Sequence, residues 1–136
     1  MARKTTPAAG RIAGEEPGFP GPLDTATFLR RHWQKRPLLV RGAFPGFRDP
    51  LPSDEVLRLA ARPEAESRLV RKRPGAWSLA HGPFDPARLA RLPRRDWTVL
   101  VQDTQHFSRE AGRLLDRFAF LPRVRIDDLM VSYAVP

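Results

Sequence analysis

The last twelve residues of the chain, Arg125 to Pro136, alternate in a way that constrains the fold more than any other segment. Side chains of a strand point alternately to its two faces. Bulky apolar residues take every second position from Leu129, and smaller or more polar residues take the positions between them. The first set is Leu129, Val131, Tyr133 and Val135, and the second is Met130, Ser132 and Ala134.

This spacing predicts a core β-strand with two different faces. The small face would suit a barrel wall that leaves space for a ligand, whereas a packed core would favour bulk there. An apolar strand without a partner promotes aggregation. We therefore expect that the domain is incomplete at Pro136.

Length and composition limit the class of protein. With 136 residues, 41% of them hydrophobic, the chain can form one globular domain or part of one. No run approaches the roughly 18 apolar residues of a membrane span, and the basic start Met1 to Lys4 precedes no apolar signal core. These features predict a cytoplasmic protein with no membrane partner. Without cysteine, disulfides and thiolate metal sites are excluded, so a transition metal would need His and carboxylate ligands.

The chain carries a formal charge of +9, with 21 arginines and three lysines. Such a charge favours an acidic partner, for which nucleic acid or a ribonucleoprotein is the obvious candidate. Abundant Arg, Ala, Pro and Gly are also typical of a GC-rich coding bias, and both interpretations stay open. A basic stripe four residues apart, Arg109, Arg113 and Arg117, could likewise meet such a partner or be a solvated helix face.

Local patterns predict an α+β fold in three parts. Residues 1–22 form a flexible tail rich in Pro and Gly, residues 23–122 an α+β region, and residues 123–136 the first core strand. We expect helices after caps at Asp24 or Thr25, at Ser53 and at Ser108, with a helical turn around Pro86 to Leu92. Strands are expected at Leu38 to Arg41, Arg68 to Lys72, Trp77 to Ala80 and Trp97 to Val101, the middle two joined by a type II turn at Pro74-Gly75.

The three histidines do not form an obvious metal site. An iron site with two His and one carboxylate is commonly marked by His-x-Asp or His-x-Glu, and none of His32, His81 and His106 is followed by this pattern. Asp103 and His106 are better explained as a polar loop, and His32 and His81 as partly buried, hydrogen-bonded side chains. Because adjacent strand residues face opposite sides, Asp127 and Asp128 cannot converge as a catalytic dyad.

The aromatic residues do not form an obvious nucleic-acid platform either. Trp33, Trp77 and Trp97 each fit the apolar side of a predicted element, so we expect them in the core.

Several strings together resemble a known family, the cupin-type JmjC oxygenases that hydroxylate ribosomal proteins, specifically the bacterial ribosomal protein arginine hydroxylases. The similarity extends over about residues 23 to 136, and its most specific parts are Trp33 to Pro37 and Asp127 to Met130. The strings are FLRRHWQKRPLLVRG from Phe28, ESRLV from Glu66, HGPF from His81, WTVLVQ from Trp97 and LPRVRIDDLMVSYAVP from Leu121.

The resemblance implies a double-stranded β-helix that holds Fe(II) and 2-oxoglutarate and hydroxylates an arginine of a large-subunit ribosomal protein. In that family the metal ligands and the residue that anchors 2-oxoglutarate follow the strand like Met130 to Pro136. No catalytic or metal residue is therefore expected in this chain, which should be inactive and bind no iron alone. By analogy, Met130 and Ser132 on the small face line the cofactor pocket, although they could equally only pack the wall.

Two other functions remain open from the sequence. One is a non-catalytic basic module that binds RNA or the ribosome, and the other is a degenerate cupin-like scaffold without iron. An oxygenase would contact nucleic acid only weakly and non-specifically, whereas a phosphate-binding module would lose affinity steeply with salt. The oligomeric state is not predicted.

Overall fold

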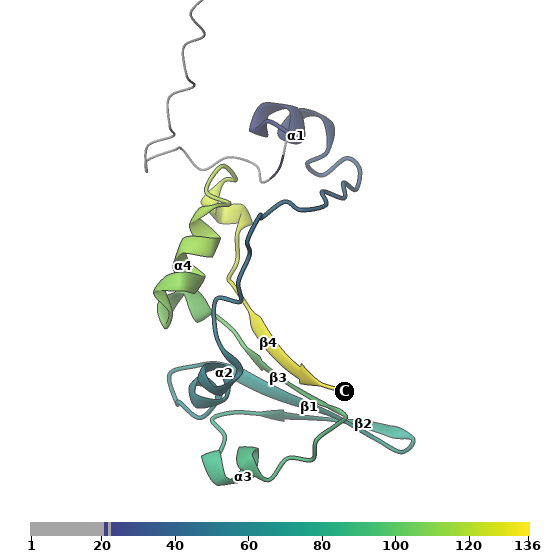
Figure 1. The fold of residues 1–136 in the computed structure, drawn as a ribbon, viewed down its shortest axis with the longest axis vertical. Coiled ribbons are helices and arrows are strands. Elements are labelled where there is room, and N and C mark those ends of the chain that lie inside the picture. Colours follow the sequence, from purple (N-terminus) through teal and green to yellow (C-terminus); the bar gives the residue numbers. More distant parts are fainter. Residues whose placement is uncertain (1–20, 22) are drawn as a thin grey trace, which may run out of the picture.

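The computed structural model describes residue 21 and residues 23–136, so the predicted tail, apart from Gly21, lies outside the described residues. These residues form short helices around an antiparallel sheet (Figure 1). Its elements in chain order are α1 (Thr25–Arg31), α2 (Ser53–Ala60), β1 (Ser67–Arg73), β2 (Ala76–His81), α3 (Pro86–Ala90), β3 (Trp97–Val101), η1 (Thr104–His106), α4 (Arg109–Asp116), η2 (Arg123–Arg125) and β4 (Val131–Val135).

The four strands form one sheet in the order β2-β1-β3-β4, and every neighbouring pair is antiparallel. The hairpin between β1 and β2 turns at Pro74-Gly75, where Gly75 has φ +72°. This is the left-handed conformation that the third residue of a type II turn requires and that glycine adopts without steric cost. The predicted hairpin and the predicted strand Trp97 to Val101 are confirmed.

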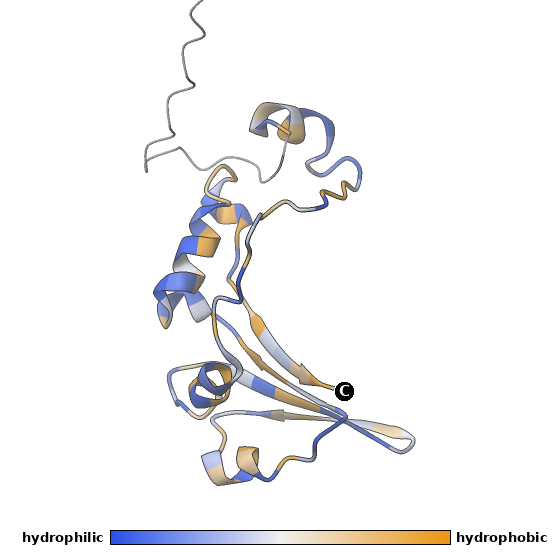
Figure 2. Cartoon of the chain, viewed as in Figure 1, coloured by the Kyte–Doolittle hydropathy of each residue, from blue (hydrophilic) through white to orange (hydrophobic). Residues whose placement is uncertain are grey.

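The core lies on one face of this sheet, where α2 packs against β1, β3 and β4. The sheet contributes Leu69, Val99 and Val101, and the helix contributes Val56 and Leu59, all almost wholly buried. In Figure 2 both the strands beside α2 and the helix α4 mix hydrophobic and hydrophilic colours. A helix–sheet layer of this kind buries the apolar stripe of α2 as its sequence predicts.

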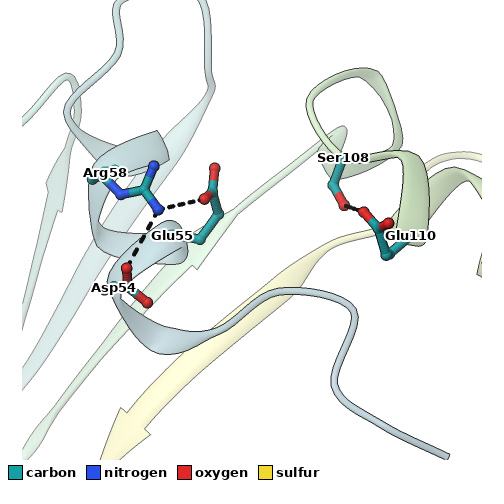
Figure 3. Close-up of polar contacts among 5 residues, drawn as sticks. All are labelled: Asp54, Glu55, Arg58, Ser108 and Glu110. Atoms are coloured by element: carbon teal, nitrogen blue, oxygen red, sulfur yellow. Dashed lines mark hydrogen bonds and ion pairs between the residues drawn. The ribbon is translucent and has the colours of Figure 1, made fainter.

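Two helix starts, whose charged and polar side chains are drawn in Figure 3, differ in how they are capped. At α4 the predicted cap is confirmed, because the Ser108 hydroxyl accepts a hydrogen bond from the Ala111 N–H. At α2 the predicted cap is wrong. Pro52 is the N-cap residue and no side chain caps the helix, while Arg58 pairs with Asp54 and Glu55 along the helix surface.

The predicted strand at Leu38 to Arg41 is wrong. Residues 37–40 have no strand structure, and the Leu39 side chain is 75% exposed. A strand needs a neighbour to bond its backbone groups, and all four strands of the described residues pair with one another instead. The segment is a connection between α1 and the rest of the molecule (Figure 1).

Aromatic rings join α1 to the chain after α4. The Phe28 ring of α1 meets Phe120 edge-on at 6.0 Å, and Phe118 lies 6.0 Å from Phe44. The Arg117 guanidinium lies over the Phe44 ring, 5.1 Å from its centroid, a cation–π contact. Along the residues from 23 to 136, no helix is long and apolar enough to cross a membrane.

Candidate functional site

The alternation predicted for the terminal strand is present in β4. Val131, Tyr133 and Val135 are partly buried against the core, and Ser132 and Ala134 between them are exposed. The Tyr133 ring meets the Trp97 ring of β3 edge-on at 5.6 Å. The two faces of this strand therefore have different environments, as the sequence predicts.

Strand register extends the exposed face of β4 across the whole sheet. Ser132 is paired with Leu100 of β3, which is paired with Arg68 of β1, and paired residues share a face. We call this surface, which α2 does not cover, the open face. Its residues are His81, Leu79 and Trp77 of β2, Arg68, Val70 and Lys72 of β1, Thr98 and Leu100 of β3, and Ser132 and Ala134 of β4, with Met130 just before β4.

The open face contains a polar pair that the sequence did not reveal. Arg68 donates a hydrogen bond from its guanidinium to the side-chain carbonyl of Gln102, 34 residues away. The Arg68 Nε is buried and has no partner in the described part of the chain. In the sequence, the one indication of such a pair is a charged residue within a strand that also carries apolar residues. Only the strand register shows that Arg68 lies on the same face as Ser132.

A network of hydrogen bonds fixes the backbone that leads into Met130. The wholly buried Thr104 donates to the Leu129 carbonyl from its hydroxyl at 2.6 Å and from its N–H at 3.0 Å. The Leu129 N–H donates to the Gln105 side chain at 3.0 Å, and Asp128 accepts from the Asp103 N–H at 3.0 Å. This junction ties η1 to the start of β4 and so sets where Met130 and Ser132 lie.

The junction also defines the roles of the acidic residues near β4. Asp128 is partly buried and accepts a backbone hydrogen bond, whereas Asp127 is exposed. Both residues precede β4, so the strand geometry expected for this pair is not present at these positions.

The described residues contain no group of three or more His, Asp or Glu side chains that could hold a metal ion. His106 lies 4.0 Å from an Asp103 carboxylate oxygen on the exposed surface of η1, a polar loop as predicted. His32 is partly buried, as predicted, and stacks on Phe28 at 6.4 Å, and its Nδ1 has no hydrogen-bond partner among the described residues. The expectation of a partly buried His81 is wrong, since His81 lies on the open face and is exposed.

Of the tryptophans predicted to lie in the core, Trp97 is buried and Trp77 is exposed. Trp97 is in the core at 8% exposure, with its Nε1–H donating to the Pro93 carbonyl at 2.6 Å. The core position predicted for Trp77 is wrong, because its side chain is 71% exposed. Trp77 lies on the open face, which α2 does not cover. The alternation of apolar and polar residues along β2 does not indicate which of its two faces a helix will cover.

Known proteins are similar to this chain in both sequence and fold. The ribosomal protein uL16 3-hydroxylase of Escherichia coli is 42% identical over 114 residues, which are 84% of this chain and 30% of that protein. A probable ribosomal oxygenase of Haemophilus influenzae is 34% identical over 117 residues, 85% of this chain and 29% of that protein. No family model matches the chain.

Solved structures agree with these sequence relatives. YcfD, a ribosomal oxygenase from Escherichia coli in complex with cobalt and 2-oxoglutarate, superposes with a TM-score of 0.77 at 41% identity. The same oxygenase with cobalt and succinic acid also gives a TM-score of 0.77. Each match covers 87% of this chain and 32% of the oxygenase.

The chain thus spans about a third of the length of the relatives it matches. The resemblance inferred from the sequence is confirmed, as is the α+β class as part of a cupin-type JmjC fold. We therefore identify the chain as a homologue of the ribosomal oxygenases, with the fold of about a third of such a protein.

Proposed function

We propose that this chain is part of an Fe(II)- and 2-oxoglutarate-dependent oxygenase that hydroxylates an arginine of a large-subunit ribosomal protein. The observation that carries the proposal is the 41% identity and TM-score of 0.77 with an oxygenase solved with cobalt and 2-oxoglutarate. Cobalt there stands in for the iron of the working enzyme. The relative from Escherichia coli named as a uL16 3-hydroxylase supports a ribosomal protein as the substrate.

The described residues do not fit an iron site. His32, His81 and His106 lie in different elements, and no group of three suitable ligands occurs among residues 23–136. We infer that the ligands come from residues beyond those of this chain, and we assign no chemical step to the chain itself. The absence of iron binding by the chain alone stays a prediction.

The contribution we propose for this chain is a wall of the cofactor pocket. Met130 and Ser132 lie on the open face, where no helix of the described residues covers them. A small residue at position 132 leaves room for a ligand, and Arg68 with Gln102 offers hydrogen-bond donors across the same surface. The junction at Thr104 holds this wall in register. Residues 123–136 would then be the first core strand of the barrel.

The experiment compares full-length protein carrying this chain with its Ser132→Phe variant. Succinate formed from 2-oxoglutarate is measured with Fe(II) and a ribosomal protein fraction. We expect substrate-dependent succinate from the unchanged protein and a large loss in the variant, because the added ring would fill the pocket. An Ala134→Ser variant, which changes the same face by one small polar group, is the control and should retain turnover.

Two results would contradict the proposal in different ways. No substrate-coupled succinate from the unchanged protein would refute the oxygenase function. Full activity of a folded Ser132→Phe protein would refute only the pocket position of this strand. A cytoplasmic location, which the ribosomal substrate favours, is part of the same proposal.

A further inference from the structure

The tip of the β1–β2 hairpin projects beyond the sheet. Strand β3 pairs with β1 only from Ser67 to Arg71, and one further backbone hydrogen bond joins Lys72 to Asp96, so the hairpin from Arg73 to Ala76 extends beyond this pairing. Figure 1 shows the hairpin extending past the ends of β3 and β4. Both faces of the tip are therefore accessible in the described structure.

The charge of this hairpin has one sign. The segment from Ser67 to His81 contains four cationic side chains and no carboxylate. At the tip, Lys72 and Arg73 are exposed, and neither takes part in an ion pair among the described residues. The Lys72 N–H donates to the Asp96 carbonyl at 2.9 Å, which brings the loop containing Arg94 and Arg95 to the same end. Asp96 is the acidic residue of this loop, and among the described residues its side chain takes part in no ion pair.

An exposed aromatic ring lies among these cations. Trp77 is directly opposite Lys72 in the antiparallel pair, so the two side chains share the open face. The Trp77 side chain is 71% exposed, and Leu79, the next residue on that face, is 58% exposed. The exposed Trp77 ring can contact a partner without any rearrangement of the core. A nucleotide base can stack on the face of this ring while the adjacent phosphate binds the nearby ammonium group.

We propose that the tip of the β1–β2 hairpin binds single-stranded RNA, with one base stacked on Trp77 and flanking phosphates bound by Lys72 and Arg73. Exposed aromatics on a four-stranded sheet beside basic side chains are a common way to bind unpaired nucleotides. The concentration of positive charge argues against a basic peptide as the occupant. This surface is independent of the pocket proposed around Ser132, which lies at the opposite edge strand of the sheet.

The test measures binding of full-length protein carrying this chain to a fluorescein-labelled oligouridine by fluorescence anisotropy at several salt concentrations. Trp77→Ala should weaken binding about tenfold, as expected from the energy of one base–aromatic stack, and Trp77→Phe should recover most of the loss. Lys72→Gln with Arg73→Gln should lower the slope of log K against log salt by about 1.4, because two phosphate contacts are lost.

The matched control removes the same charge elsewhere. Arg109→Gln with Arg113→Gln takes two exposed cations from α4 and should change the affinity much less than the hairpin pair. Polyglutamate tests a general polyanion, and an arginine-rich peptide tests a protein ligand on the same surface.

The outcomes separate the hairpin from general electrostatics. The proposal is overturned if the two double variants weaken RNA binding equally, or if folded Trp77→Ala protein binds like the unchanged chain. Tight binding of polyglutamate or of the arginine-rich peptide that depends on Trp77 would overturn it as well. Circular dichroism confirms that each variant is folded, and the charge variants decide the question if Trp77→Ala is not.

Discussion

Replacement of Tyr133 by alanine tests whether β4 is held in the sheet by the side chains on the face that packs against the core. The Tyr133 ring is partly buried and lies edge-on to Trp97 at 5.6 Å. Removing a fully buried large aromatic side chain costs about 3–5 kcal/mol, and the ring pair itself contributes about 1 kcal/mol. Because Tyr133 is only partly buried, we expect a loss of about 2.5 kcal/mol in the free energy of unfolding.

The measurement is urea denaturation followed by tryptophan fluorescence, for which Trp97 is a direct reporter of the strand pair. With an m value of about 2 kcal/mol/M, the midpoint should fall by about 1.2 M. The matched variant Ser132→Ala changes the exposed neighbour and should stay within about 0.5 kcal/mol of the unchanged chain. Equal losses from both variants, or no loss from Tyr133→Ala, would refute the assignment of the two faces.

Three further predictions concern caps, close contacts and acid. Ser108→Ala should lower the free energy of unfolding, measured by thermal denaturation, by about 1 kcal/mol because its cap hydrogen bond is lost. Ser53→Ala should leave this free energy almost unchanged, because Ser53 makes no cap bond. A larger loss for Ser53→Ala than for Ser108→Ala would contradict the cap assignments. Gly82→Ala should lower the free energy of unfolding by about 2 kcal/mol, because a Cβ would collide with Ser67 Oγ and approach the Ala60 carbonyl. Gly112→Ala on α4 should raise it by about 0.5 kcal/mol. Equal effects of the two variants in urea unfolding would be inconsistent with this packing. Hydrogen bonds from Thr27 hold the pKa of Asp24 below the ordinary value of an aspartate. The stabilisation of α1 by this carboxylate is therefore present above the ordinary pKa of an aspartate and is lost as the pH falls through the lowered pKa. An NMR titration midpoint at or above the ordinary value would disprove it, and Asp24→Asn should abolish the dependence.

Local patterns predicted the elements whose signals lie within a few residues. The Pro74-Gly75 turn specified the hairpin, because its required backbone conformation suits proline and glycine. The apolar run at Trp97 to Val101 became β3 with the predicted bounds. The Ser108 cap is a contact over three residues, and it is correct for the same reason.

The errors concern features that depend on distant partners. The run at Leu38 to Arg41 has strand propensity, but no neighbouring strand is available to it. Trp77 fits either side of β2 equally well, and only the position of α2 decides which side is covered. At Ser53 the preceding Pro52 takes the cap position, one residue before the one expected.

The candidate site shows the same limit. Alternation placed Met130 and Ser132 on a common face, and both side chains are exposed in the structure. The pairing of Arg68 with Gln102 joins residues 34 positions apart, and no local pattern indicates it. Recognition of the family came from strings along the chain, and structural superposition with an oxygenase now supports it.

We propose that this chain belongs to an enzyme that hydroxylates a ribosomal protein. The most direct test of this proposal is mass spectrometry of ribosomal proteins after incubation with full-length protein carrying this chain, Fe(II) and 2-oxoglutarate. We expect the gain of one oxygen atom on an arginine of a large-subunit protein, and this gain should depend on 2-oxoglutarate. No such gain with folded, iron-loaded protein would contradict the proposal.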